Sequence, residues 1–197
     1  MLGLIQKDFY QLVQYQRVLI LIVVAFAATC AWTLDNAFFM VYPSVITAMN
    51  VVTLQSYDER SGFTCYSRVM PISIKTIVGE KYLCGAILIL LICLIEAASF
   101  LVLHHSMVDT LQAVGFILAV GLLSLSLFVP FAFALGVERG RIAYTVALGV
   151  FCALAFLIKD CFLSIPLVTL GCGILICVLF TVISYAISVI AYGRRAF

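Results

Sequence analysis

The sequence predicts an all-α membrane protein with six transmembrane helices, because its apolar residues are too many and too clustered for a water-soluble fold. Of the 197 residues, 65% are hydrophobic and 10% are charged, and the mean hydropathy is +1.25. Soluble domains are about 45–50% apolar and about 25% charged. Six runs reach the roughly 20 apolar residues that a helix needs to cross a bilayer. They are Val18–Leu34, Ala37–Leu54, Leu83–Leu103, Leu111–Gly136, Ile142–Ile158 and Ile165–Tyr192.

The six runs form one predicted domain over residues 1–197, since no linker-like or low-complexity tract divides them. Pro43 and Pro130 predict kinks in the second and fourth spans. The sixth run is long enough to begin with a short re-entrant turn around Ser164–Pro166. The chain is therefore expected to be a single bundle of spans with short connections, apart from residues 1–16 and 55–82.

Residues 1–16 predict an amphipathic helix that lies on the membrane surface. Apolar side chains recur there at helical spacing, and polar side chains occupy the opposite face. The apolar set is Leu2, Ile5, Phe9, Leu12 and Val13, and the polar set is Gln6, Lys7, Gln11 and Gln14. The alternative interpretation is a polar lead-in to the first span. A cleavable signal is not indicated, because an early basic cluster and a small-residue cleavage site are missing.

Basic residues are distributed unevenly around the predicted spans. Ten of the 11 lysines and arginines fall on one side, namely before the first span, after the second, after the fourth and after the sixth. Lys159 alone falls on the other side. Because cytoplasmic loops carry an excess of Lys and Arg, both termini and the 55–82 connection are predicted to be cytoplasmic.

The 55–82 connection concentrates charge in a chain that is otherwise mostly hydrocarbon. Its charged residues are Asp58, Glu59, Arg60, Arg68, Lys75, Glu80 and Lys81. A short helix is expected in which Phe63, Tyr66 and Met70 share one face, ending at Pro71 because proline cannot continue a helix. Ser73 then predicts the cap of a second helix that runs into the third span. Such a segment predicts a contact surface for a soluble partner.

Two parts of the sequence resemble the small six-span permease subunits of ABC-2-type transporters. The opening Lys7-Asp8-Phe9 is similar to the family's Lys-Asp-Phe/Leu start. The 55–82 connection is similar to the family's Y-D-E, Y-x-x-x-L-P-[IV]-S-R-K and I-V-x-x-K-Y motifs. The matching segments are Tyr57–Arg60, Tyr66–Ser73 and Ile77–Tyr82. Met70 replaces the usual leucine, and Ile74 stands where an arginine is common.

This resemblance implies a permease that forms a homodimer in a bacterial cytoplasmic membrane and carries one cytosolic ABC ATPase per protomer. The short helix would be the coupling helix seated in a groove of that ATPase. Within the family, the chain is similar to exporters of phenol-soluble modulins and other small amphipathic peptides. The residues expected to contact the ATPase are Tyr57, Asp58, Glu59, Arg60, Phe63, Tyr66 and Arg68.

No nucleotide-binding motif is present in the sequence. The pattern G-x-x-x-x-G-K-[ST] does not occur, and Val78–Lys81 lacks both the glycine-rich lead and the hydroxyl residue. We therefore expect ATP and magnesium to bind the partner ATPase, and no cofactor to bind this chain. The eight cysteines are expected to pack as small hydrophobes, and the net charge of +2 argues against a nucleic-acid partner.

Glu96 is the one ionisable residue well inside a predicted span, where a charge costs at least about 2.5–3.5 kcal/mol. It either faces a translocation path as a ligand for cationic substrate groups, or it is a protonated carboxyl bonded to Thr47 or Asn50. Polar stripes in the second and sixth spans have the same two interpretations, helix packing or path lining. The residues predicted to line the path are Glu96, Asn50, Thr47 and Ser184.

An alternative function also depends on Glu96. A proton- or ion-coupled secondary carrier could use this carboxyl alone, without an ATPase. An intramembrane enzyme would need a His, Asp or metal beside it, and the predicted spans offer neither residue near Glu96.

The topology can be tested by cysteine labelling in a cysteine-free background. A cysteine at position 159 is expected to react with an impermeant maleimide from outside, whereas cysteines at 60, 139 and 194 react only after the membrane is opened. Labelling of position 159 from the cytoplasmic side alone would contradict the six-span arrangement.

Overall fold

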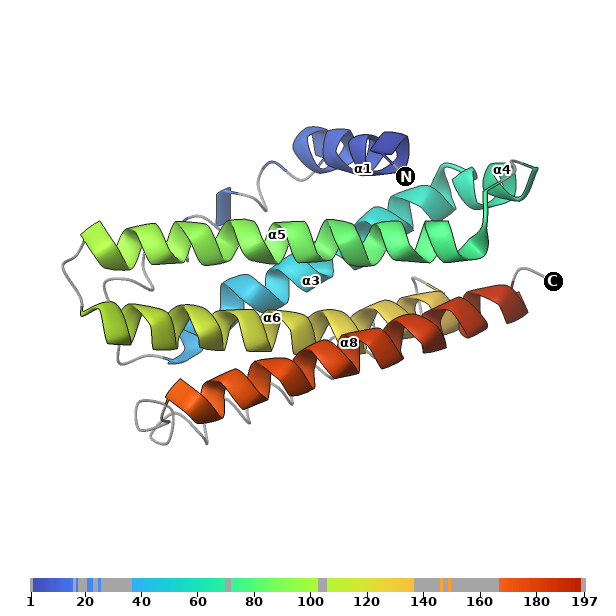
Figure 1. Cartoon of the computed structure of the whole chain (residues 1–197). Helices are drawn as coiled ribbons and strands as arrows, with labels where there is room; N and C mark the ends of the chain where they lie inside the picture. The colour runs from blue at the N-terminus through green and yellow to red at the C-terminus, as the bar shows by residue number, and fades with distance from the viewer. Residues whose placement is uncertain are drawn as a thin grey trace.

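The structure, a computed structural model, describes residues 2–15, 17, 21–22, 25, 37–69, 72–102, 106–136, 146, 149 and 167–195. All regular elements in these ranges are helices (Figure 1). They are α1 (Leu2–Tyr15), α3 (Ala37–Arg60), α4 (Phe63–Val69), α5 (Ile74–Val102), α6 (Met107–Leu135) and α8 (Leu167–Arg195). The predicted all-α class is confirmed for the described part of the chain.

Three helices in the described ranges are long and apolar enough to cross a membrane, namely α5, α6 and residues Leu170–Arg194 of α8. They correspond to the predicted third, fourth and sixth spans. A helix of 29 residues is about 43 Å long, whereas the hydrocarbon core is about 30 Å thick, so these helices extend beyond it. The apolar run of α5 begins at Leu83, which leaves Lys75, Glu80 and Lys81 in the part that precedes the span.

The remaining predicted spans have different outcomes. Ala37–Leu54 falls on α3, which contains Pro43 and continues as helix to Arg60. The predicted spans Val18–Leu34 and Ile142–Ile158 lie almost entirely outside the described residues, as does the predicted turn at 164–166. The first residues of the expected 55–82 connection belong to α3, which continues to Arg60, and its last residues belong to α5, as predicted.

The four long helices form a bundle in which α6 is central. It packs against α3, α5 and α8, and it is the most buried of the three apolar helices. The main apolar cluster comprises Ile46, Val51, Val78, Ile89, Ile92, Cys93, Ile117, Leu125, Val129 and Phe133. Cys84 and Cys93 are free and buried in apolar clusters, which confirms the predicted packing role for these two cysteines.

Local signals in the sequence position the helix ends. Ser73 Oγ accepts a hydrogen bond from the Thr76 amide at 3.2 Å, so the predicted cap of α5 is confirmed. Ser106 caps α6 in the same way through the Asp109 amide. Gly62 has φ of +72° in the turn from α3 to α4, a conformation that costs glycine little. Met70 and Pro71, which were predicted to end the short helix that corresponds to α4, lie outside the described residues.

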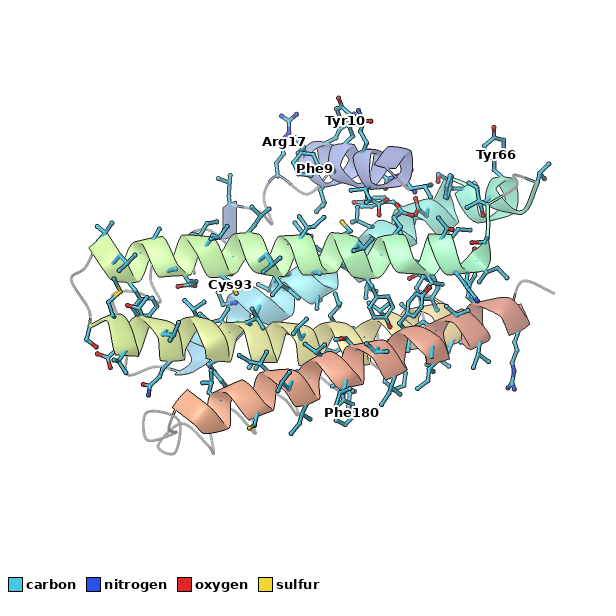
Figure 2. All side chains as sticks on the ribbon, in the orientation of Figure 1. Phe9, Tyr10, Arg17, Tyr66, Cys93 and Phe180 are labelled. Carbon is cyan, nitrogen blue, oxygen red and sulfur yellow. The ribbon has the colours of Figure 1, made fainter. Side chains whose placement is uncertain are left out.

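One end of the bundle holds the C-terminus of α3, all of α4, the N-terminus of α5 and the C-terminus of α8 (Figure 1). We call it the charged end. Helix α1 lies beside this end, in contact with α3 and α5. Leu12 is buried there against Leu54 and Cys84, whereas Phe9 and Tyr10 are exposed (Figure 2). The predicted apolar face of α1 is therefore split, because Leu12 packs on protein whereas Phe9 and Val13 are exposed.

Close packing of α3, α5 and α6 depends on Gly85. A Cβ at this position would overlap Leu125 Cδ1 of α6 and lie 3.1 Å from Val51 Cγ2 of α3. Gly85→Val is expected to reduce the free energy of unfolding by about 1–3 kcal/mol. The matched control is Gly171→Val on α8, where nothing lies within 4 Å of the added Cβ. Equal losses of thermal stability in the two purified variants would contradict this packing.

Candidate functional site

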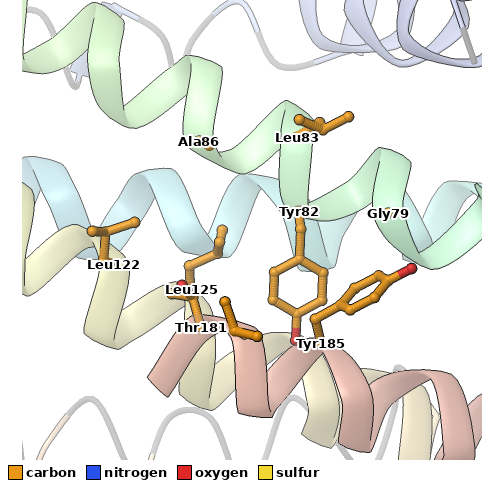
Figure 3. A pocket seen from close by; sticks show the side chains of 9 residues that line it. Gly79, Tyr82, Leu83, Ala86, Leu122, Leu125, Thr181 and Tyr185 are labelled. Atoms are coloured by element: carbon orange, nitrogen blue, oxygen red, sulfur yellow. The ribbon is translucent and has the colours of Figure 1, made fainter. Parts of the chain in front are cut away.

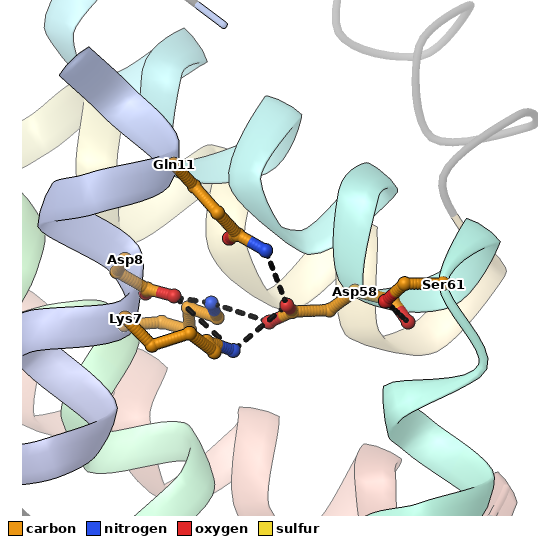
Figure 4. Close-up of polar contacts among 6 residues, drawn as sticks. Lys7, Asp8, Gln11, Asp58 and Ser61 are labelled. Atoms are coloured by element: carbon orange, nitrogen blue, oxygen red, sulfur yellow. Dashed lines mark hydrogen bonds and ion pairs between the residues drawn. The ribbon is translucent and has the colours of Figure 1, made fainter. Parts of the chain in front are cut away.

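Charged side chains from three helices converge at the charged end of the bundle (Figure 4). Lys7 and Asp8 come from α1, Asp58 comes from the last turn of α3, and Lys81 comes from α5. We call these four residues the ion-pair cluster. Its bonded members lie up to 73 positions apart in sequence, so their meeting fixes how three distant segments pack.

Lys81 is at the centre of the ion-pair cluster. Its Nζ donates to Asp8 Oδ2 at 2.7 Å and to Asp58 Oδ2 at 2.7 Å. The side chains of Lys81, Asp8 and Asp58 are 3%, 0% and 5% exposed, so water screens these pairs little. One buried cation therefore joins α1 to α3 through two charge-assisted hydrogen bonds.

Lys7 closes the cluster on its more exposed side. Its Nζ lies 2.7 Å from Asp58 Oδ1 and 3.3 Å from Asp8 Oδ1. The same ammonium lies 3.8 Å from the centre of the Phe63 ring, within the range of a cation–π contact. Gln11 Nε2 adds a long hydrogen bond of 3.5 Å to Asp58 Oδ1. Lys7 thus connects α1 to both the end of α3 and the start of α4.

Helical periodicity explains why the cluster forms where it does. Residues four apart lie on one helix face, so Asp8 and Leu12 of α1 face the bundle together. Leu54 lies one turn before Asp58 in α3, and it packs against Leu12. The result is a polar layer of ion pairs stacked on an apolar layer. Lys7 and Gln11, predicted on the solvent face of α1, are instead half-buried and bonded to Asp58, because the ion pairs draw that side of the helix inward.

Glu80 adds a third acidic side chain next to the ion-pair cluster. It is 0% exposed, and its carboxyl oxygens accept no hydrogen bond from the described residues. Its neighbours in electrostatic range include Lys81, Asp8 and Lys7. Within the described ranges, no group of three or more His, Cys, Asp or Glu side chains is arranged to hold a metal ion. The cluster therefore has the character of a structural joint between helices.

The residues predicted to contact an ATPase fall into different environments. Asp58, predicted to contact an ATPase, is instead buried in the ion-pair cluster, where Lys7 and Lys81 compensate its charge. Arg60 is exposed at the end of α3, and Tyr66 is 59% exposed on α4. Tyr57, Glu59 and Phe63 are partly buried. The side chain of Arg68 lies outside the described set.

The sequence interpretation missed Lys7, Asp8 and Lys81 as one site. Each was noted as part of a motif or as a charge that sets the topology, and none was assigned a partner. The available signal was that Asp8 lies one turn before an apolar residue, and that Lys81 lies directly before the apolar run of α5. A charge in such a position is costly to bury unless it is paired.

The residues predicted to line a path are buried within the bundle. Ser184 of α8 donates to the Ser126 carbonyl of α6 at 2.5 Å and bonds the Tyr82 hydroxyl of α5 at 2.7 Å. These bonds identify Ser184 as a contact between three helices.

The other three predicted path residues lie in α3 and α5. Thr47 donates to the Pro43 carbonyl at 2.6 Å, which leaves it no hydrogen to donate to Glu96. Asn50 is 4% exposed, and Glu96 is completely buried in α5. The structure therefore gives none of these side chains access to solvent.

Comparison with known proteins gives one match. A protein-family model described as "ABC-2 family transporter protein" matches residues 3–193. No curated protein and no solved structure matches the chain. The match covers both α1 and α8, so it includes every helix that contributes to the charged end of the bundle.

The ion-pair cluster predicts a large difference between two lysines of α5. Lys81→Met leaves Asp8 and Asp58 buried without their shared cation, and should cost about 3–5 kcal/mol of folding free energy. Lys75→Met is the control, because Lys75 is exposed and in no ion pair with described residues. Thermal unfolding of the purified variants measures both effects. The triple change Lys81→Met, Asp8→Asn and Asp58→Asn should recover part of the lost folding free energy. A triple variant as unstable as Lys81→Met alone would contradict the charge explanation.

Proposed function

Because this chain belongs to the ABC-2 family of transporters, we propose that it is the transmembrane subunit of an ATP-driven exporter, with α4 as the helix that contacts a separate ATPase. Hydrolysis is assigned to the partner, since the chain has no nucleotide-binding motif of its own. ATP and magnesium would bind there. This subunit would contribute the path through the membrane and the mechanical connection to the ATPase.

One observation carries the proposal. Helix α4 lies at the charged end of the bundle, where Tyr66 points away from α5 and α8 (Figure 2). Tyr66 is 59% exposed, and Val69 of the same helix is 86% exposed. Exposed apolar and aromatic side chains among charged residues are typical of a protein–protein contact. A lipid contact would instead be expected along the apolar runs. The position therefore supports a soluble protein partner.

The arrangement also supports a mechanical role for α4. It follows α3 after a turn at Ser61 and Gly62, and Phe63 at its first position contacts Lys7 of α1. A displacement of α4 by the ATPase would act on α3, which α4 contacts, and on α5, which follows α4 in the chain. The ion-pair cluster would carry the same displacement to α1. We propose that this coupled movement opens the bundle alternately to the two sides of the membrane.

The membrane arrangement and cargo belong to the same proposal. The charged end would face the cytoplasm of a bacterium, with both termini inside, in agreement with the 10-to-1 distribution of basic residues. Two copies would form a homodimer around the path. The cargo would be a small amphipathic peptide or another hydrophobic compound, in line with the motif resemblance to exporters of such peptides.

A secondary carrier that uses Glu96 is the competing function. Glu96 is completely buried in α5, which fits a proton-binding carboxyl as well as a structural one. The two functions differ in their energy source. Transport that continues with an ATPase partner inactivated would favour the carrier.

The ATPase contact can be tested by comparing two tyrosines with similar exposure. Tyr66→Ala on α4 should weaken co-purification of the ATPase about fivefold or more and reduce ATP-dependent export, since aromatic contacts dominate such interfaces. Tyr10→Ala on α1, where the side chain is 64% exposed, should leave both unchanged. Both measurements use the permease and its ATPase produced together and reconstituted in liposomes. Unchanged binding and export in the Tyr66 variant would refute the role of α4.

A further inference from the structure

A groove of about 330 Å³ lies between α5, α6 and α8 (Figure 3). Its lining includes Gly79, Tyr82, Ala86, Leu122, Thr181 and Tyr185. We call it the α5–α8 groove. Its volume is at the lower end of the range that small-molecule sites have in proteins. The glycine and alanine on α5 leave the space that the larger side chains of α6 and α8 surround.

The walls of the α5–α8 groove are apolar because the tyrosine hydroxyls are already bonded to protein. The Tyr82 hydroxyl lies 2.7 Å from Ser184 Oγ and 2.9 Å from Ser188 Oγ. The Tyr185 hydroxyl donates to the Lys75 carbonyl at 3.1 Å. The two rings pack edge to face with centroids 5.8 Å apart. The groove therefore offers an occupant ring faces and aliphatic carbon, with few free polar groups.

The rim of the groove is apolar and exposed. Leu83 of α5 and Val182 of α8 line it, and both are exposed large apolar residues. The groove also lies where the apolar run of α5 begins at Leu83, close to the charged end. An occupant there would have one end among acyl chains and the other at the level of the lipid headgroups.

One basic residue lies at the end of the groove that is nearer to the headgroups. Lys75 is exposed and directly adjacent, since its backbone accepts the Tyr185 hydrogen bond. It lies one turn before Gly79 of the groove lining, so the two residues share a face of α5. Lys75 forms no ion pair with another side chain in the described ranges. An uncompensated cation beside an apolar groove is complementary to a ligand with an anionic head and an apolar tail.

We propose that the α5–α8 groove binds an acyl chain of an anionic phospholipid, whose phosphate lies near Lys75. The inference needs α5 and α8 to cross a membrane, and it does not depend on the direction or cargo of transport. A transported amphipathic peptide and a second copy of the chain are the other candidate occupants. The positive charge at one end and the apolar rim favour the phospholipid.

The test is native mass spectrometry of the full chain, delipidated in detergent and then given phosphatidylglycerol or phosphatidylcholine. Wild-type protein should retain phosphatidylglycerol in preference to phosphatidylcholine. Lys75→Gln should weaken retention of phosphatidylglycerol about fivefold, the contribution expected of one basic residue near an anionic lipid. Ala86→Phe should reduce retention of both lipids by filling the groove, and Thr181→Phe fills it from α8 if the first variant does not fold.

Leu175→Phe on the exposed face of α8, outside the groove, is the control and should retain lipid as the wild type does. Equal retention of the two lipids by the wild type would refute the role of the Lys75 charge. Retention that neither groove variant changes would overturn the site. A shift of the groove variants from dimer to monomer, with no lipid bound to the wild type, would assign the groove to a second copy instead.

Discussion

Lys81 lies between two carboxylates, one from α1 and one from α3, at a depth where water does not screen its charge. Burying the ammonium without a partner would be costly, and the same holds for the carboxylates of Asp8 and Asp58. The three groups must therefore stay together, and each brings its helix with it. The positions of α1, the last turn of α3 and the start of α4 all follow from this pairing, since Lys7 pairs with the same two carboxylates and its ammonium contacts the Phe63 ring.

The apolar contacts of the bundle are less specific than this ion pairing. Inside a bilayer the lipid tails are as apolar as leucine, so burying apolar surface selects helix partners only weakly. Close contacts at Gly85 and the hydroxyl bonds of Tyr82 with Ser184 and Ser188 supply the remaining specificity. The polar residues of α8 are used in this way, as connections between helices. The candidate sites are thus found at the edges of the bundle, one at the charged end and one at the groove toward lipid.

The sequence predicts much of the fold because span formation depends on local composition. The runs that correspond to α5, α6 and α8 can be recognised from hydropathy alone, and Ser73 identifies the start of α5. The site was predicted less well. Asp58 was assigned to a partner contact because nothing in a one-dimensional sequence shows that Lys81, 23 positions later, and Lys7, 51 positions earlier, would enclose it. For the same reason, periodicity could place Lys7 and Gln11 on a polar face of α1 but could not reveal their contacts with Asp58.

The central claim is that the ion-pair cluster holds α1 and α4 as one unit during transport. The most direct measurement is the distance between spin labels at Tyr10→Cys on α1 and Val69→Cys on α4, both exposed positions, in the transporter assembled with its ATPase. Electron paramagnetic resonance would record it without nucleotide and with ATP trapped. One narrow distance distribution, the same in both states and broadened by Lys81→Met, is the predicted result. A wild-type distance that changes with nucleotide, or one that Lys81→Met leaves narrow, would contradict the account.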